Sequence, residues 1–401
     1  MSSRGVSLHG SGFIISQETA ASLGFGRLEG LEQHIRPYLN GRDLTGRSRD
    51  MMVIDLFGLS SDEVLRRFPE VYQWVRDRVK PVREGNVSQT SDSREYAERW
   101  WLFGKVRTEL RSAVKGLSRY IATVETAKHR VFVFLDASVL PDNKLINFAF
   151  ADAYFLGVLS SSVHVVWALA AGGKLGPTPV YVKTACFDTF PFPVCSEGQK
   201  ETIRDIAERL DAHRKRQQEL DPDLTLTEMY NVLETVRAGK ELTEKERRIY
   251  DAGLVGILRV LHDALDAAVF DAYGWPTELT EEDILSSVVA LNAQRLSEER
   301  EGSVRWLRPE FQAPNELAVQ AALAGIVSGE GPAPTRRKQP WPSTLQEQVR
   351  AVKDALRATP LQSAQQVAAT FKPASRTRVS EILDTLTALG QTRRVEDRYT
   401  L

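Results

Sequence analysis

Three runs of consecutive apolar residues in the first half of the chain have the length and composition of buried β-strands. They are MMVIDLF (51–57), RYIATVE (119–125) and RVFVFLD (130–136), each bounded by polar or turn-forming residues. Between the first two, SSDEVLRRFPEVYQWVRDRV (60–79) has apolar residues at helical spacing, with Ser61 as a candidate N-cap. Residues 1–196 are therefore expected to form a mixed α/β domain.

A second helical pattern follows Asp152, a candidate N-cap, and ends at Gly172-Gly173. Its apolar run, 153–171, has nearly the length of a membrane span, but three serines and a histidine interrupt it and its flanks carry little charge. A buried helix is therefore favoured over a membrane span. The region closes with FDTFPFPV (187–194), whose prolines exclude regular structure.

Residues 197–327 are predicted to be helical, with apolar stripes inside and charges outside. The first stripe is Ile203, Ile206 and Leu210, and the second is Leu254, Ile257, Leu261, Leu265 and Val269. Breaks between helices are expected at 221–223 and 273–276, where proline or glycine occurs. Since no catalytic motif accompanies the stripes, they are interpreted as core.

The C-terminal region contains a Gly- and Pro-rich linker (328–343) followed by a compact pattern over 344–401. Three helices (344–358, 363–371 and 375–390, the last ended by Gly390) and a hairpin (391–401) have the order of a winged helix. From Thr335 to Leu401 there are twelve Lys/Arg and six acids. Ser375, Arg376, Thr377 and Arg378 begin the third helix, where a recognition helix presents residues to DNA. A protein-binding winged helix is an equally good interpretation, because fold does not fix function.

The bulk composition limits the possible classes of protein. At 401 residues the chain is too long for one ordinary core. Its net charge of −1 excludes a polycation, so a nucleic-acid site requires local segregation of charge. Two cysteines, Cys186 and Cys195, cannot build a disulfide framework, which fits a cytoplasmic location. The six histidines have no zinc-site spacing, and the start has no signal-peptide pattern.

Charge segregation is strongest over residues 98–130, which hold eight Lys/Arg, three acids and four aromatic residues. Cations neutralise phosphates, and exposed rings stack on bases. This stretch is therefore a candidate nucleic-acid surface. The alternative is an amphipathic surface with a few core aromatics, and Trp100 and Trp101 are expected to be partly core.

The sequence contains none of the motifs that methyl transfer to a base amino group requires. There is no Pro-Pro pair for the loop that holds a flipped base, and the glycine pairs at 10–12 and 24–26 do not follow strand-like runs. A Walker A loop, a Gly-x-Ser-x-Gly elbow and a nuclease cluster are also missing from the sequence. Ser160, Ser161 and Ser162 beside His164 are interpreted as packing residues.

Several long motifs nevertheless occur in a specific order. They are the segments 34–58, 119–136, 140–146, 156–176, 183–193, 265–275 and 291–312. Together they resemble the target-recognition region and the following helical segment of MmeI-like (type IIL-like) DNA adenine methyltransferases, which are large restriction-modification and phage-defence enzymes. In that family a methyltransferase domain precedes this region, and no positions of this chain match its S-adenosylmethionine turn or its Asn-Pro-Pro-Tyr loop.

The resemblance implies recognition of duplex DNA, with base-edge contacts setting the sequence and phosphate contacts the register. The candidate contacts on the matching motifs are Arg42, Asp43, Arg119, Thr123, Glu125, Thr126, Lys128, His129, Asn143, Lys144, Lys174 and Lys183. A glycine-led loop between the motifs adds Lys105 and Arg107, and the winged helix adds Arg376 and Arg378. Lys105 and Lys128 are the strongest of these. Glu125 could accept from a cytosine amino group or form an internal salt bridge with Arg119 or Lys128.

The expected fold class is α+β and multidomain: a mixed α/β target-recognition domain (1–196), a helical domain (197–327), a linker (328–343) and a winged-helix-like domain (344–401). The leading hypothesis is the DNA sequence-recognition part of an adenine-N6 methyltransferase. It has no cofactor, catalytic residue or metal site of its own and no membrane contact. S-adenosylmethionine is expected in a separate catalytic subunit or domain.

Two alternatives remain open from the sequence. One is a non-enzymatic DNA-binding or assembly protein that acts mainly through its winged helix. The other is a self-sufficient enzyme with unrecognised motifs, which S-adenosylmethionine binding by the isolated chain would reveal.

Overall fold

The computed structural model describes residues 1–88, 90–313, 339–342, 344–358, 362–372, 376–388, 391–395 and 398–400. The chain forms two compact units, Met1–Arg305 and Trp306–Leu401. It is α+β and multidomain, as the sequence predicts. The predicted boundaries at 196, 327 and 343 stay predictions, and most of the predicted linker (328–338 and 343) lies outside the described residues.

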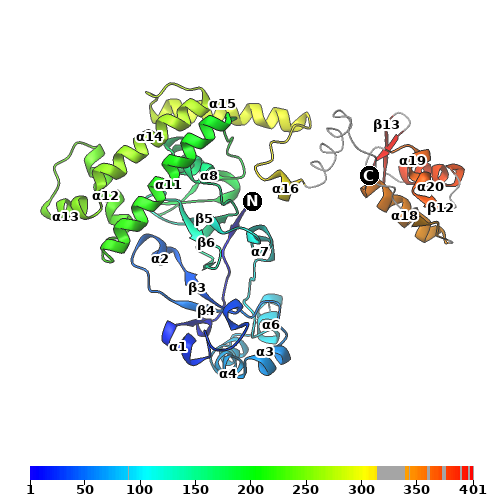
Figure 1. The fold of residues 1–401 in the computed structure, drawn as a ribbon, viewed down its shortest axis with the longest axis horizontal. Coiled ribbons are helices and arrows are strands. Elements are labelled where there is room, and N and C mark those ends of the chain that lie inside the picture. The colour runs from blue at the N-terminus through cyan, green and yellow to red at the C-terminus, as the bar shows by residue number, and fades with distance from the viewer. Residues whose placement is uncertain are drawn as a thin grey trace. The chain divides into compact units, whose positions relative to one another are not determined.

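The first unit contains two four-stranded sheets (Figure 1). One has the order β1-β8-β5-β6, with antiparallel neighbours throughout. Its strands are β1 (Ser2–Arg4), β5 (Arg119–Val124), β6 (Val133–Asp136) and β8 (Leu145–Phe148). The predicted strands at 119–125 and 130–136 are thus confirmed as neighbours. Five consecutive residues of β5 are buried, as expected for a strand covered on both faces.

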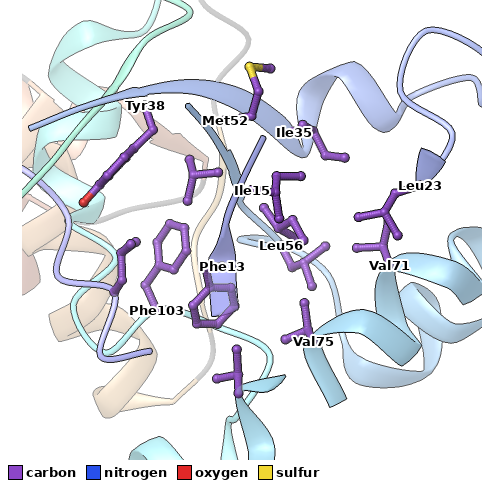
Figure 2. Packing of buried hydrophobic residues seen from close by; sticks show 14 of the residues in the cluster. Phe13, Ile15, Leu23, Ile35, Tyr38, Met52, Leu56, Val71, Val75 and Phe103 are labelled. Atoms are coloured by element: carbon purple, nitrogen blue, oxygen red, sulfur yellow. The ribbon is translucent and has the colours of Figure 1, made fainter. Parts of the chain in front are cut away.

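The second sheet has the order β2-β4-β3-β7, in which β3 and β7 are parallel and the other pairs are antiparallel. Its strands are β2 (Ile14–Ile15), β3 (Ile35–Leu39), β4 (Met52–Ile54) and β7 (Leu140–Pro141). The predicted strand at 51–57 is therefore present but shorter. Figure 2 shows Phe13, Ile15, Leu56 and Phe103 converging with Val75 in the core between this sheet and the nearby helices.

The helices of this part are short. They are α1 (Gln17–Ser22), α2 (Gly41–Thr45), α3 (Ser61–Arg67), α4 (Pro69–Arg78), α5 (Lys80–Gly85), α6 (Ser91–Glu98) and α7 (Thr108–Val114). The helical pattern predicted over 60–79 is confirmed, but it forms two helices, α3 and α4, rather than one. Phe68 precedes a proline, which disfavours helical backbone, and it adopts φ −138° and ψ 66°. The N-cap is Ser60 rather than Ser61, in a capping box with Glu63.

The apolar run after Asp152 forms two helices, α8 (Ala153–Ser160) and α9 (Ser162–Ala171), bent by 62° at Ser161. Asp152 caps α8 as predicted, but the single helix ending at Gly172 is wrong because Ser161 has extended backbone. Seven of the eight residues of α8 are buried. Among the described residues no single helix is long and apolar enough to cross a membrane. Among the described residues, only the bent α8–α9 pair, taken together, has the length and apolar composition of a membrane span.

Longer helices follow, and α11 packs against α8 and α14 (Figure 1). The four-residue helix α10 (Lys183–Cys186) comes first. It is followed by α11 (Glu197–Leu220), α12 (Leu226–Arg237), α13 (Glu244–Ala252), α14 (Val255–Tyr273) and α15 (Glu281–Arg300). The first predicted stripe is confirmed, since Ile203, Ile206 and Leu210 are buried.

The second stripe is wrong at its start. Leu254 and Ile257 are exposed, and the buried face of α14 begins with Val255 and Leu258. Leu254 lies before the helix in the left-handed region, whereas Leu261, Leu265 and Val269 are buried as predicted. Both predicted breaks are confirmed, and Gly274 ends α14 at a φ of 70°, where glycine is favoured.

The second unit contains three helices and an antiparallel hairpin at the predicted places. They are α18 (Leu345–Ala358), α19 (Ala364–Ala369), α20 (Arg376–Ala388), β13 (Arg393–Val395) and β14 (Arg398–Thr400). It also contains α16 (Pro309–Gln312) and the short parallel pair β11 (Gln339–Pro340) and β12 (Phe371–Lys372). Val352, Val367, Leu383 and Tyr399 belong to its apolar core. Its assignment as a winged helix stays a prediction, and Ser375 and Gly390 lie outside the described residues.

Candidate nucleic-acid interface

Several segments meet where the two sheets join. The turn between β7 and β8 links the sheets directly, and the Asp142 N–H donates to the Leu39 carbonyl at 2.8 Å. At the end of β5, the Glu125 N–H donates to the Lys144 carbonyl at 2.8 Å. Thr126, the next residue, bridges to Val180 of the hairpin β9 (Gly173–Leu175) and β10 (Thr178–Val180). Residues far apart in sequence are thereby gathered on one face.

Helix α2 completes this face, since it contacts β3, β5 and α12 (Figure 1). A Cβ atom at Gly41 would lie 2.9 Å from Val124 Cγ1, so any other residue here would require the Val124 side chain or the helix to shift. We define the junction surface by Arg4, Arg42, Thr126, Asn143, Lys144 and Lys174, which are contributed by these segments and by β1. Four of the six side chains are cationic.

The start of α2 is fixed by a capping box between Asn40 and Asp43. Asn40 Oδ1 accepts from the Arg42 and Asp43 N–H groups at 2.9 and 3.0 Å, and Asp43 accepts from the Asn40 N–H at 3.0 Å. Arg49 donates to both Asp43 oxygens at 2.7 and 2.8 Å. Burial acts to raise the pKa of Asp43, but the hydrogen bonds from Arg49 and Asn40 outweigh it and hold this pKa below its usual value. The Asp43 carboxylate is thus engaged within the protein, whereas Arg42 is exposed and its side chain has no partner among the described residues.

Glu125 is buried, with 6% of its side chain exposed, and it forms ion pairs with Arg4 and Lys144. The partners considered from the sequence, Arg119 and Lys128, are not the ones observed. Arg119 starts β5 and Glu125 follows its end, so about 20 Å of strand separates them. Glu125 is also too enclosed to reach a base edge.

The side chains of Arg119 and Thr123 make contacts within the protein. Arg119 donates to Glu208 of α11 at 2.9 Å and lies over the Phe134 ring at 3.7 Å from its centroid. The Glu208 hydrogen bonds raise the pKa of Arg119. Thr123 is 1% exposed and donates to the Val131 carbonyl at 2.7 Å.

Lys128 and His129 face α12. Lys128 Nζ lies 2.8 Å from Asn231 Oδ1 and 2.8 Å from Glu234 Oε2. His129 Nε2 also lies 2.8 Å from Asn231 Oδ1. The hydrogen bond from Lys128 lowers the pKa of Glu234. These two side chains connect the recognition region to the helical segment, and their contact with DNA stays a prediction.

Lys105 and Arg107 have partners within the protein. Lys105 donates to Asp92 at 2.8 Å, and this hydrogen bond raises the pKa of Lys105. Arg107 precedes α7 with φ 56° and donates to the Gly5 carbonyl at 3.0 Å. The aromatic residues of the same stretch are core residues: Trp100 and Phe103 are buried, and Trp101 Nε1 donates to the Leu59 carbonyl at 2.9 Å. The buried rings cannot serve as a base-stacking platform.

The remaining candidates lie in four places. Lys174 is exposed on β9 and Asn143 is half-buried in the β7–β8 turn, and neither side chain has a partner among the described residues. Lys183 lies 3.8 Å from Asp188. In the second unit, Arg378 donates to Glu381 at 2.9 Å, while the side chain of Arg376 is outside the described part of the chain.

The structure therefore brings Arg42, Thr126, Asn143, Lys144 and Lys174 together and adds Arg4, which the sequence does not single out. A three-residue strand near the N-terminus has no periodicity that marks it. Within the described ranges, no group of three His, Cys, Asp or Glu side chains is placed to hold a metal ion. What the junction surface offers is exposed positive charge on a fixed backbone.

Comparisons with known proteins agree with this architecture. Residues 3–194 match the family model described as "MmeI, target recognition domain". The chain is 35% identical over 82 residues to the protein named DNA methyltransferase A of Bacillus subtilis (strain 168), a match that covers 20% of this chain and 9% of that protein. It also shares a fold with the solved type IIL restriction-modification enzyme MmeI in complex with DNA, with a TM-score of 0.57 and 19% identity.

That structural match covers 74% of this chain and 35% of the solved chain, so the chain spans about a third of its solved relative. The resemblance stated from the motifs is confirmed. Residues 3–194 of this chain are an MmeI-like target recognition domain.

Proposed function

We propose that this chain binds duplex DNA and reads its sequence as the specificity part of an S-adenosylmethionine-dependent adenine-N6 methyltransferase. The match of residues 3–194 to a target recognition domain carries the proposal. The solved relative of the same fold is in complex with DNA. The system is of the restriction-modification or phage-defence type, and it acts in the cytoplasm.

The junction surface supports this role. Arg42 and Lys174 are exposed without partners among the described residues, so forming a phosphate contact breaks no ion pair. Phosphate contacts set the register of a protein on DNA, and nearby polar groups such as Asn143 and Thr126 can then reach base edges. Lys128 and Lys105 already have acidic partners, so contacts made by them require exchange of those partners.

Methyl transfer, in this proposal, comes from a separate catalytic subunit or domain that binds S-adenosylmethionine. The test is transfer of a labelled methyl group to mixed-sequence duplex DNA, by this chain alone and with the product of the neighbouring open reading frame. Transfer only with both proteins supports the proposal. Transfer by this chain alone, or S-adenosylmethionine binding by it, contradicts the division of roles.

The C-terminal helices offer a different route to DNA, which the full-length chain can test. The variants Lys174→Gln and Arg378→Gln each remove one exposed cation, from β9 and from α20 respectively. If the recognition domain dominates, Lys174→Gln weakens DNA binding more. A larger effect of Arg378→Gln supports the non-enzymatic alternative, in which the winged helix binds.

A further inference from the structure

One buried carboxylate in the first unit has two cationic partners. Glu125 accepts from Arg4, 121 residues away in the sequence, and from Lys144 at 3.4 Å. Its side chain is 6% exposed, whereas those of Arg4 and Lys144 are 52% and 67% exposed. Arg4 and Lys144 therefore contact the buried carboxylate, while a large part of each side chain remains exposed to solvent.

The charges of this cluster do not cancel. A buried carboxylate needs one cation to offset its charge, so the second cation leaves one positive charge among these three side chains. Asp142, in the same turn as Lys144, adds one negative charge and accepts from the Tyr38 hydroxyl at 2.6 Å and from the Lys144 N–H at 2.9 Å. Arg42 and Lys174 of the same junction surface add two more positive charges with no partner among the described residues. The surplus lies on exposed groups, where a polyanion can reach it.

The backbone around Glu125 is held from two sides. Its N–H donates to the Lys144 carbonyl at 2.8 Å, and its carbonyl accepts from the Tyr181 N–H at 2.7 Å. Arg4 lies in β1, paired with Ile146 of β8. Both cations thus extend from paired or hydrogen-bonded backbone and share one fixed anchor, which lowers the entropy lost when they bind a ligand.

We infer that Arg4 and Lys144 form a phosphate-binding pair for the backbone of duplex DNA, and that Glu125 is the residue that positions them. This inference rests on the proposed function and adds Arg4 and the role of Glu125 to it. Phosphate is favoured over a base edge because the junction surface keeps a surplus of positive charge, which a phosphate neutralises and an uncharged base does not. Such contacts carry no sequence information of their own.

The test is the dependence of DNA affinity on salt, measured by fluorescence anisotropy with the full-length chain. Each phosphate contact contributes about 0.9 to the slope of log affinity against log salt concentration. Arg4→Gln and Lys144→Gln are each expected to reduce the slope by about 0.9, equally on all duplex sequences. Arg4→Lys and Lys144→Arg keep the charge and are expected to keep the slope. Each single variant leaves Glu125 one cation.

Arg209→Gln is the matched control, because it removes an exposed arginine paired with Asp205 on α11, away from the junction surface. Its slope is expected to equal that of the wild type. A normal slope for both Gln variants, with wild-type DNA binding intact, overturns the phosphate pair but leaves the proposed function standing. A loss of DNA affinity that depends on the identity of one base pair overturns the phosphate pair in favour of base recognition. Absence of DNA binding by the wild type overturns the proposed function itself.

Discussion

The carboxylate of Asp266 on α14 accepts a hydrogen bond from the backbone N–H of Ser162, the first residue of α9, at 2.6 Å. It occupies the place of an N-cap side chain but comes from another helix, 104 residues later in the sequence. The bend between α8 and α9 leaves this N–H without a partner in its own helix, so the contact joins the recognition region to the helical segment.

Asp266 makes the stability of the fold depend on pH. Burial raises its pKa to about 6 from an ordinary value of 3.8, and the Ser162 hydrogen bonds only partly oppose this. The folded state therefore holds the proton more tightly than the unfolded state. The stability contributed by protonation is fully present below about pH 3.8 and is lost as the pH rises through 6.

Asp266→Asn removes that dependence and keeps an acceptor for the Ser162 N–H. We expect the variant to gain about 1 kcal/mol of unfolding free energy relative to the wild type on going from pH 5 to pH 8. Urea unfolding at the two pH values measures the difference. An identical difference between variant and wild type at both values contradicts the prediction.

The sequence could indicate much of this fold but not the Asp266 contact. Continuous apolar runs gave β4, β5 and β6 correctly, because strands covered on both faces have a distinct composition. The short strands β1 and β7 have no such pattern, and they depend on partners far away in the sequence. Helix breaks at Phe68 and Ser161 depend on local backbone and on tertiary contacts that a periodicity does not record.

Dependence on contacts between distant parts of the chain also limits how much of the candidate site the sequence could predict. Motif resemblance placed Arg42, Lys144 and Lys174 on a recognition region, and the structure brings them to one surface. Charge counting could not distinguish these residues from Arg119, whose ion pair with Glu208 forms only when α11 packs on the sheet. Arg4 could not be found, since its partner Glu125 is 121 residues away.

Gly41 sets the approach of α2 to β5. We expect Gly41→Ala to lower the unfolding free energy by about 1–3 kcal/mol, because the new Cβ would lie 2.9 Å from Val124 Cγ1. Thermal unfolding followed by circular dichroism measures the change. Gly198→Ala is the control: its Cβ meets nothing within 4 Å in the first turn of α11, so alanine is expected to be neutral or stabilising. Equal melting temperatures for Gly41→Ala and the wild type would show that the contact relaxes at no cost.

Arg119 is expected to matter for stability rather than for DNA. Arg119→Gln removes the hydrogen bonds to Glu208 and the contact with Phe134, and we expect a loss of about 1–2 kcal/mol in unfolding free energy. The salt dependence of DNA binding by Arg119→Gln is expected to match that of the wild type. A reduced salt slope with unchanged stability would instead show that Arg119 contacts DNA.

We propose that this chain recognises duplex DNA through its target recognition domain. The most direct measurement is the affinity of the full-length wild-type chain for duplex DNA between 50 and 200 mM salt. We expect binding that weakens steeply with salt, with a shallower dependence in a variant carrying both Arg42→Gln and Lys174→Gln. An affinity that stays constant across this range, or no binding at its lower end, contradicts the claim.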